Sequence, residues 1–385
     1  MLDPTRYLVI PGGLVDVHVH FRDPGVPEAE TRASGAAAAA AGGFSLVVTM
    51  PNTTPAGDNP AWIREQIEDD SLPCRIWPSA CITKGRLGAE VADLEALAAA
   101  GAAFFTDDGS YVADAKVMRE AMVRAAKLGK AVCQHAVVPE LLGAGVIRNC
   151  PIARKYNLPV MPPEAETEAV RRDIALVRET GCALHVQHIS CAETVELIRS
   201  ARREGLPVSG EATPHHLLLS CEDIPANDAN FKMAPPLGCR EDRAEIRRGV
   251  IDGTLSMFAT DHAPHLAAKK QGGFIGTANG IVGLETAVAV TYQAMVVEEG
   301  MSEQEWVARW TTGPLALLGL PQGLSPSGVC PQLGSVPNKG LSPSGLGTTI
   351  IDRKANKAVE PANFKSKSRN TPFAGMTFAA WPVES

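Results

Sequence analysis

Eight short apolar runs alternate with longer, amphipathic segments along most of the chain. The apolar runs predict strands at 13–20, 44–50, 75–82, 102–106, 131–135, 183–189, 207–212 and 256–260. The segments between them predict helices, among them 61–68, 90–100, 116–128, 164–180, 192–204 and 241–252. Strands that alternate with helices form parallel sheets, and nearly continuous apolar strands indicate burial on both faces. The pattern therefore predicts an α/β protein with a parallel sheet inside a layer of helices.

Reactive side chains gather at the carboxyl ends of these predicted strands. They are His18, His20, Asn52, Asp107, Asp108, His135, His188, Asp261 and His265. In a closed (β/α)8 barrel the carboxyl ends of the strands surround one site, so residues far apart in the sequence meet there. We therefore expect a (β/α)8 barrel with its active site at that end.

The pair His18 and His20 ends the first predicted strand. Successive strand side chains point to opposite faces, so two histidines one residue apart point the same way and can share a cation. Neutral imidazole suits zinc and similar ions. By the same argument His185 and His188, which are three residues apart, cannot both be ligands.

Composition narrows the class of protein. The chain has 385 residues, of which 45% are hydrophobic and 21% charged, so it can bury the core of a large barrel. A net charge of −7 argues against binding to nucleic acid or to an anionic membrane and favours a small-molecule substrate. No apolar run reaches membrane-spanning length, and the first residues lack a secretory signal. Nine scattered cysteines without a Cys-X-X-Cys pair predict reduced thiols and a cytoplasmic location.

Four motifs carry a family resemblance. They are 11–25, which contains the histidine pair, 50–53, 105–109 and 259–265. Together they resemble dihydroorotases, which are cyclic amidohydrolases, and the likeness runs from about residue 11 to residue 320. It resumes at 364–375, where 365–373 resembles the family's carboxyl-terminal signature. The resemblance implies an amidohydrolase barrel that interconverts dihydroorotate and N-carbamoyl-aspartate in pyrimidine biosynthesis with the help of zinc.

The resemblance also implies a set of metal ligands. His18, His20 and Asp261 would hold one zinc ion, His135 and His188 would hold a second where it is present, and Asp108 would bridge the two. Hydantoinases, allantoinases and many dihydroorotases have a carbamylated lysine as the bridge, whereas this chain resembles the bacterial dihydroorotases that have aspartate. A shorter, singly charged carboxylate holds a second ion less firmly, so the number of zinc ions stays open at one or two.

Catalytic and substrate-binding roles follow from the same resemblance. Asp261 would be the general base that takes a proton from the attacking water and returns it to the leaving ring nitrogen. Arg22, two residues beyond His20, would bind the exocyclic carboxylate with bidentate geometry. The other implied substrate contacts are His20, Asn52, Ala234, His265, Asn279 and Gly280. The remaining histidines, His185, His215, His216 and His262, are expected to be hydrogen-bonded supports, and so is Asp107.

Some positions depart from the family pattern. The family has asparagine and arginine where this chain has Ala234 and Gly238, and a proline-phenylalanine pair where it has Ala278 and Asn279. The polar residues that follow the fifth-strand histidine in the family are also absent after His135. We expect weaker substrate affinity, unless the contact at position 234 is made by backbone atoms.

The predicted domains are a barrel at 11–320, a linker at 321–347 rich in Gly, Pro and Ser, and a remnant β-sandwich made by 348–385 with 1–10. Family members normally begin with several sandwich strands, and only about ten residues precede Pro11 here. We therefore expect a truncated sandwich whose strands lack partners. The linker is expected to be flexible, and it contains the same six residues twice, at 323–328 and 340–345.

Two alternatives stay open. One is a related cyclic amidohydrolase acting on hydantoins or allantoin, for which a bridging lysine is expected. The other is an inactive dihydroorotase-like subunit that scaffolds aspartate carbamoyltransferase, which is expected to have lost metal ligands. A homodimer and an association with aspartate carbamoyltransferase are further expectations about partners.

Overall fold

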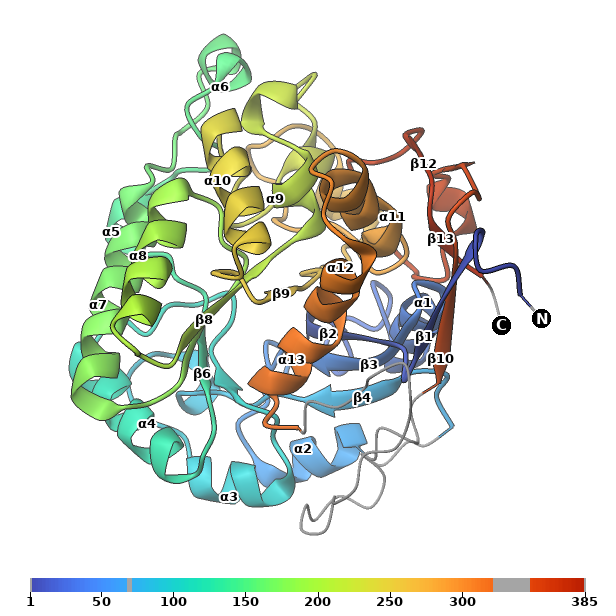
Figure 1. Ribbon diagram of the computed structural model, residues 1–385. Helices are drawn as coiled ribbons and strands as arrows, with labels where there is room; N and C mark the ends of the chain where they lie inside the picture. The colour runs from blue at the N-terminus through green and yellow to red at the C-terminus, as the bar shows by residue number, and fades with distance from the viewer. Residues whose placement is uncertain (1, 68–70, 321–346, 384–385) are drawn as a thin grey trace.

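The computed structural model describes residues 2–67, 71–320 and 347–383. Eight parallel strands form its centre (Figure 1). They are β2 (Leu14–Val19), β3 (Phe44–Thr49), β4 (Arg75–Pro78), β5 (Phe105–Thr106), β6 (Val132–Gln134), β7 (Leu184–Val186), β8 (Val208–Ala212) and β9 (Met257–Phe258). Hydrogen bonds join neighbouring strands in two sheets, one with the order β2-β3-β4 and the other with the order β5-β6-β7-β8-β9. Parallel bridges between Ala80 and Phe105 and between Val19 and His262 connect the two sheets at both seams, so the strands close into a barrel.

Helices surround the barrel. Those that follow its strands are α1 (Arg32–Ala41), α2 (Pro60–Ile67), α3 (Leu94–Ala100), α4 (Ala115–Lys127), α7 (Glu164–Thr180), α8 (Ala192–Arg203), α10 (Arg240–Ile251), α12 (Glu303–Trp310) and α13 (Thr312–Leu317). Shorter helices lie in the connections: α5 (Pro139–Leu142), α6 (Pro151–Tyr156), α9 (Pro214–Leu218) and α11 (Ala287–Thr291), which continues into η5 (Tyr292–Val297). Single turns form η1 (Lys84–Arg86), η2 (Cys221–Asp223), η3 (Ala229–Phe231), η4 (Ala267–Lys270) and η7 (Pro361–Asn363).

The alternating pattern of the sequence explains this architecture. All eight predicted strands are confirmed, and five of the six predicted helices begin and end within one residue of their prediction. The helix predicted at 90–100 was wrong in its first turn, because Asp93 caps the helix by accepting a hydrogen bond from the backbone N of Ala96. The strand predicted at 75–82 is also shorter, since β4 ends at Pro78.

Both faces of the strands are buried. In β3, Leu46 and Val48 pack in a cluster with Val15 and Met257 of other strands. Val47, which alternates with them, belongs to the cluster that includes the alanines of α1 and the tryptophan rings of α12. Burial on both faces is the reason that the strands read as nearly continuous apolar runs. Among the described residues, no helix is long and apolar enough to span a membrane.

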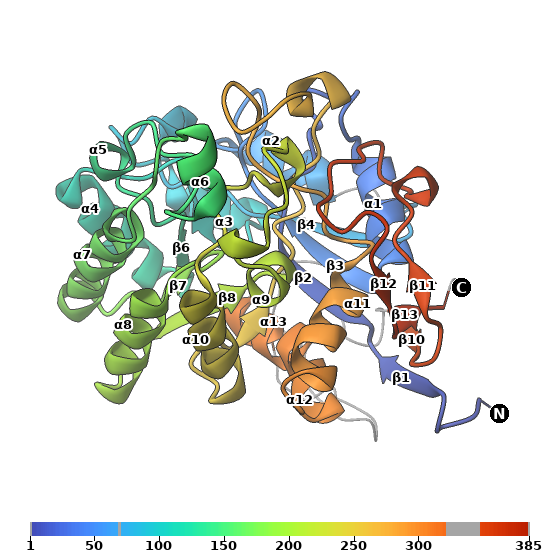
Figure 2. The same ribbon diagram turned by 90° about the horizontal axis from the view of Figure 1, so that it is seen from above.

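A small antiparallel sheet lies beside the barrel, close to α1 and α11 (Figure 2). Its strand order is β1 (Tyr7–Pro11), β10 (Thr348–Asp352), β13 (Trp381–Pro382). A separate antiparallel pair consists of β11 (Lys357–Ala358) and β12 (Thr377–Phe378). The expectation that these strands lack partners was wrong for β10, which pairs with β1 along its whole length and with β13 on its other side. Except for Gly347, the predicted linker lies outside the described residues.

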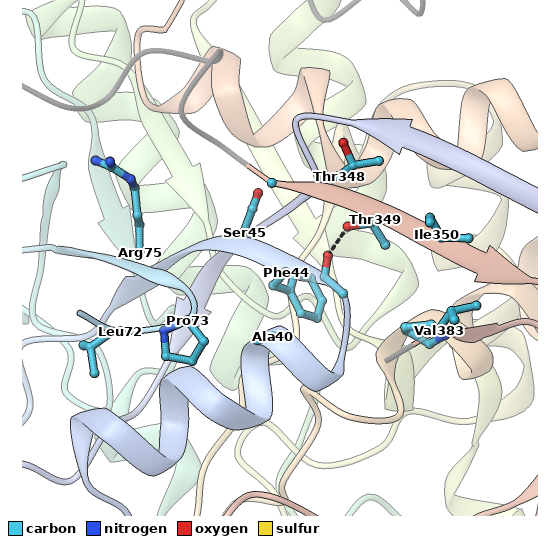
Figure 3. Close-up of a pocket in the computed structure, with 13 residues that line it drawn as sticks. Ala40, Phe44, Ser45, Leu72, Pro73, Arg75, Thr348, Thr349, Ile350 and Val383 are labelled. Carbon is cyan, nitrogen blue, oxygen red and sulfur yellow. Dashed lines mark hydrogen bonds between the residues drawn. The ribbon is translucent and has the colours of Figure 1, made fainter. Parts of the chain in front are cut away.

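The small sheet contacts the amino-terminal ends of the barrel strands. Thr349 of β10 donates a hydrogen bond from its Oγ1 to the carbonyl of Gly43, just before β3 (2.5 Å, Figure 3). A hollow beside this contact is lined by Ser45 at the start of β3, Arg75 at the start of β4, and Ile350 (Figure 3). It therefore lies at the opposite end of the barrel from the polar side chains that the sequence singled out.

Candidate metal centre and substrate site

Six histidine and aspartate side chains converge at the carboxyl end of the barrel. His18 lies in β2 and His20 follows it, Asp108 follows β5, His135 follows β6, His188 follows β7 and Asp261 follows β9. Two groups of these side chains could each hold a metal ion, because their ligand atoms lie within 4.8 Å of one another: His18, His20 and Asp108 form one, and Asp108, His135 and His188 the other. Asp108 belongs to both groups.

In the first group the two imidazoles face two carboxylates. The Nε2 atom of His18 lies 3.3 Å from Asp108 Oδ1 and 3.5 Å from Asp261 Oδ1. The Nε2 atom of His20 lies 3.3 Å from Asp108 Oδ2 and 3.0 Å from Asp261 Oδ1. Asp261 therefore completes this group as a fourth candidate ligand.

The second group lies on the other side of Asp108. Asp108 Oδ1 is 3.6 Å from His135 Nδ1 and 3.5 Å from His188 Nε2. The two imidazole nitrogens are 2.8 Å apart. The structure thus brings together all six residues that the sequence nominated as ligands, with the aspartate between the two sets of imidazoles.

The donor atoms fit a divalent metal ion. His18 Nε2 and Asp108 Oδ1 are buried and have no hydrogen-bond partner among the described residues. A buried polar atom without a partner is costly, and a cation between these atoms would compensate for it. The other ring nitrogens are already engaged: His18 Nδ1 lies 2.6 Å from Glu211 Oε1, and His20 Nδ1 lies 2.9 Å from Asn52 Oδ1. Each Nε2 is therefore the nitrogen left for a metal.

Burial and positive charge act in opposite directions on the carboxylates. Burial raises the pKa of Asp108, but the charge of His18 and the close approach of the imidazoles of His18, His135 and His188 outweigh it and hold that pKa well below its usual range. Burial also raises the pKa of Asp261, while the hydrogen bond with His20 and the charge of His18 bring it down to about 2. Both carboxylates are therefore ionised at neutral pH, as metal ligands must be.

Two of the candidate ligands have an unusual backbone conformation. His188 has a φ of 35° and Asp261 a φ of 49°, in the left-handed region that favours glycine. Such a conformation costs about 1–3 kcal/mol for other residues and is found mainly at functional sites. With these conformations Asp261 lies beside His18 and His188 lies beside Asp108.

Glu211 of β8 is a functional candidate that the sequence analysis missed. Its Oε1 accepts a hydrogen bond from the backbone N of His188 (3.0 Å) in addition to its contact with His18, and its Oε2 lies 2.9 Å from His185 Nε2. Burial raises the pKa of Glu211, but the charge of His18 and hydrogen bonds with His18 and His185 lower it far below the usual value. The available signal was a carboxylate inside an apolar predicted strand, where charges are rare unless paired.

The candidate substrate residues line the same end of the barrel. Arg22 donates from Nε to the carbonyl of Pro264 (3.2 Å), and burial lowers its pKa to about 10, so it stays cationic at neutral pH. Asn52 contacts His20, as described above. His265 Nε2 donates to the carbonyl of Asn279 (2.6 Å).

Ala234 and Gly280 belong to neighbouring segments. The backbone N of Gly280 donates to the carbonyl of Lys232 (3.0 Å), and half-buried Ala234 follows two residues later. Gly238 leaves no room for a side chain, because a Cβ atom there would be 2.4 Å from the carbonyl oxygen of Ser190. An arginine at position 238, as in the family pattern, is therefore incompatible with this backbone.

Most of the expected supporting residues do make hydrogen bonds. His185 lies between Ser209 Oγ (2.9 Å) and Glu211, and His262 Nδ1 accepts from the backbone N of Gly283 (3.1 Å). Asp107 accepts from the backbone N of Ile82 (2.8 Å) and Thr83 (3.1 Å).

The neighbouring pair His215 and His216 differs. His216 Nδ1 contacts Thr213 Oγ1 (2.7 Å), but within the described part of the chain the Nε2 atoms of both histidines lack a partner. The expectation of supporting hydrogen bonds is therefore met only in part for this pair.

Comparisons with known proteins agree with this geometry. A family described as dihydro-orotase-like matches residues 6–194. The dihydroorotase of Geobacillus sp. (strain WCH70) is 41% identical over 378 residues, which cover 97% of this chain and 85% of the relative. The dihydroorotase of Halalkalibacterium halodurans is also 41% identical, covering 100% of this chain and 86% of the relative.

Solved structures show the same fold. The D-hydantoinase of Bacillus sp. AR9 superimposes with a TM-score of 0.78 at 26% identity, over 99% of this chain and 84% of that one. The L-hydantoinase (dihydropyrimidinase) of Arthrobacter aurescens has a TM-score of 0.80 at 24% identity, over 98% of this chain and 83% of that one. With relatives of this similarity along its whole length and the barrel of the cyclic amidohydrolases, the chain belongs to the dihydroorotase family.

Proposed function

We propose that this protein is a dihydroorotase, which interconverts (S)-dihydroorotate and N-carbamoyl-L-aspartate in pyrimidine biosynthesis. The similarity to dihydroorotases over the whole chain supports this activity. The observation that carries the proposal at the site is Asp108, an aspartate common to both candidate ligand groups. An aspartate rather than a lysine at this point favours dihydroorotase over a hydantoinase or allantoinase.

We propose zinc as the metal. His18, His20 and Asp261 would hold one ion, His135 and His188 a second, and Asp108 would lie between them. Two groups of candidate ligands share Asp108, and this supports a site for two ions. A bound zinc ion would polarise the ring carbonyl and lower the pKa of a water molecule, which is the chemistry that amide hydrolysis needs near neutral pH.

Asp261 is proposed to move the proton. It takes a proton from the water that attacks the ring carbonyl and gives it to the ring nitrogen as the carbon–nitrogen bond breaks. In the direction of synthesis it takes the proton from the carbamoyl nitrogen as that nitrogen attacks the carboxyl group, and water leaves. Its place 3.0 Å from His20 Nε2, at the end of β9, supports this role.

The substrate is proposed to be oriented by groups around the metal ligands. Arg22, cationic and half-buried, would bind the exocyclic carboxylate. The other proposed contacts are His20, Asn52, Ala234, His265, Asn279 and Gly280. Asn52 and His265 lie in the loops that follow β3 and β9, the strands on either side of β2, which supports their proximity to His18 and His20.

The test is an assay of purified, zinc-loaded protein in both directions, with hydantoin and allantoin as competing substrates. We expect cyclisation of carbamoyl-aspartate and opening of dihydroorotate, with little turnover of the other two. Turnover of hydantoin without turnover of dihydroorotate would contradict the proposal. Absence of all activity and of bound metal would favour the scaffolding alternative, although all six candidate ligands are present.

Location and assembly are also proposals. A cytoplasmic location is supported by the eight described cysteines, which are all free thiols. A homodimer and a complex with aspartate carbamoyltransferase are to be tested by light scattering of the protein alone and of its mixture with that enzyme.

A further inference from the structure

The carboxyl-terminal segment reaches the proposed substrate site through one side chain, Asn370. This residue is only 5% exposed. Its Nδ2 donates to the carbonyls of Ala263 (3.0 Å) and Gly280 (3.1 Å), and its Oδ1 accepts from the backbone N of His265 (3.2 Å). Asn370 therefore links two segments, the loop after β9 and the chain around Gly280, that carry proposed substrate contacts.

An asparagine is suited to this place by its chemistry. Both amide hydrogens and the amide oxygen are used, and they meet two carbonyls and one N–H group. A carboxylate of the same shape could accept from His265 but could not donate to the two carbonyls. The backbone carbonyl of Asn370 also accepts from the backbone N of Val282 (2.8 Å), which fixes its own position.

Lys270 holds the same segment from the other side. Its ammonium group is nearly buried, with the residue 8% exposed, and donates to the carbonyls of Lys232 (3.1 Å), Ala278 (3.0 Å) and Gly280 (2.9 Å). The carbonyl of Gly280 thus accepts hydrogen bonds from both Lys270 and Asn370. The two side chains act on one point of the backbone.

The backbone at Gly280 is tightly packed. Gly280 has a φ of 116°, and a Cβ atom there would lie 2.5 Å from the side chain of Ala263. The segment therefore sits directly on the loop after β9, and His265 is held to Asn279 as described above. Asp261 has a separate anchor, because the carbonyl of the adjacent His262 accepts from the backbone N of His20 (2.8 Å).

We propose that Asn370 and Lys270 are positioning residues, which hold His265 and the backbone at 279–280 in place for the substrate. This inference rests on the proposed function, since it assigns these contacts to the same site. Neither side chain contacts a candidate metal ligand in the hydrogen bonds described above, so their loss should affect substrate binding more than metal binding.

The test compares Asn370→Ala and Lys270→Met with Ser368→Ala. Ser368 is buried in the same segment, and its Oγ donates to the carbonyl of Ala29 (2.9 Å). Its removal costs a buried hydrogen bond to Ala29 but none of the hydrogen bonds that hold the loop after β9, so it is a matched control. Each variant is measured for KM, kcat and bound zinc.

We expect KM for dihydroorotate to rise about tenfold or more in Asn370→Ala and Lys270→Met, with a smaller change in kcat and normal zinc content. Ser368→Ala should stay within about twofold of the wild type. Because both side chains bond the carbonyl of Gly280, the double variant should raise KM by less than the product of the single effects. A KM like that of Ser368→Ala, or effects that multiply, would overturn the proposal.

Hydrogen exchange gives a readout that does not depend on activity. Peptides that cover 263–265 and 278–282 should exchange faster in Asn370→Ala than in the wild type or in Ser368→Ala, and unchanged exchange would overturn the proposal. If Asn370→Ala does not fold, Lys270→Met decides by the same measurement. A wild-type protein that fails to turn over dihydroorotate would contradict the proposed function, while the exchange result would still decide the positioning role.

Discussion

At the scale of single residues, metal binding depends on how the ligand side chains are oriented as well as on which residues they are. Glu211 contacts His18 and the backbone of His188, one member of each candidate ligand group, and is 1% exposed. A carboxylate that accepts from the far nitrogen of an imidazole fixes the ring and makes it a better ligand. Glu211 therefore acts on both halves of the centre at once.

The variant Glu211→Gln tests this role. It keeps the shape of the side chain but removes the charge and replaces one of the two acceptor oxygens with an NH2 donor. We expect zinc affinity to fall about 10- to 100-fold. Zinc titration with a competing chelator measures this, with Glu164→Gln, an exposed position at the start of α7, as the control. Equal affinity in the two variants would show that Glu211 does not tune the metal.

Ala234 tests the departure from the family pattern. The variant Ala234→Asn restores the side chain of the family pattern. Position 234 lies two residues after Lys232, whose carbonyl accepts from the backbone N of Gly280. If that side chain donates one hydrogen bond of about 1 kcal/mol to the substrate, KM should fall about fivefold. Steady-state kinetics would show it, with Ala226→Asn at an exposed position as the comparison. An unchanged KM would mean that only backbone atoms contact the substrate at position 234.

The candidate ligands could be read from the sequence together with the family resemblance, whereas Glu211 could not. His18 and His20 alternate with apolar residues in a strand, so their common face follows from strand geometry. Glu211 looks like an isolated charge in an apolar run, and its partners His18 and His188 are distant in the sequence. The pairing of β7 with β8 brings it beside His188, and closure of the barrel brings it beside His18.

At the scale of elements, the spacing of apolar residues predicted which helices and strands form better than it predicted where they begin and end. The helix α3 shows the reason: the predicted pattern starts at residue 90, but the helix begins only at Leu94, because the side chain of Asp93 caps its amino-terminal end. Local hydrogen bonds of this kind compete with helix formation and shift helix boundaries. The strands β5 and β9 are likewise shorter than their apolar runs, because only two residues of each run form a strand that pairs with its neighbours.

The cap of α3 can be tested by stability. In the variant Asp93→Ala the backbone N of Ala96 loses its acceptor, and we expect the free energy of unfolding to fall by about 1 kcal/mol. Unfolding in urea measures the change, and Asp93→Asn, which keeps an acceptor, should cost less. Because α3 lies outside the barrel, turnover should not change. Equal stability of the two variants would argue against the cap.

At the scale of the whole molecule, closure of the barrel brings together residues more than 200 positions apart, such as His18 and Asp261. The order of strands and helices was enough to predict this. Residues 1–10 and 348–385 were predicted to share a remnant β-sandwich, but the register of β1 against β10 was not predictable, because no periodicity marks which residues pair. The predicted domain boundaries at 320 and 348 stay predictions.

Removal of metal should affect the whole molecule. The carboxylates and imidazoles around Asp108 are brought together only in the folded state, so a metal ion that they hold would stabilise that state. Removal of the ion would take this stabilisation away. We expect a chelator to lower the thermal midpoint by several degrees, and added zinc to restore it. A midpoint that does not respond to chelator or zinc would contradict metal binding at this centre.

The most direct test of the account is a crystal structure of the zinc-loaded protein with anomalous diffraction recorded at the zinc edge. The account predicts one anomalous peak bonded to His18, His20 and Asp261, and, if a second ion is present, another bonded to His135 and His188, with Asp108 between them. Zinc bound elsewhere, with these six side chains free of metal, would contradict it.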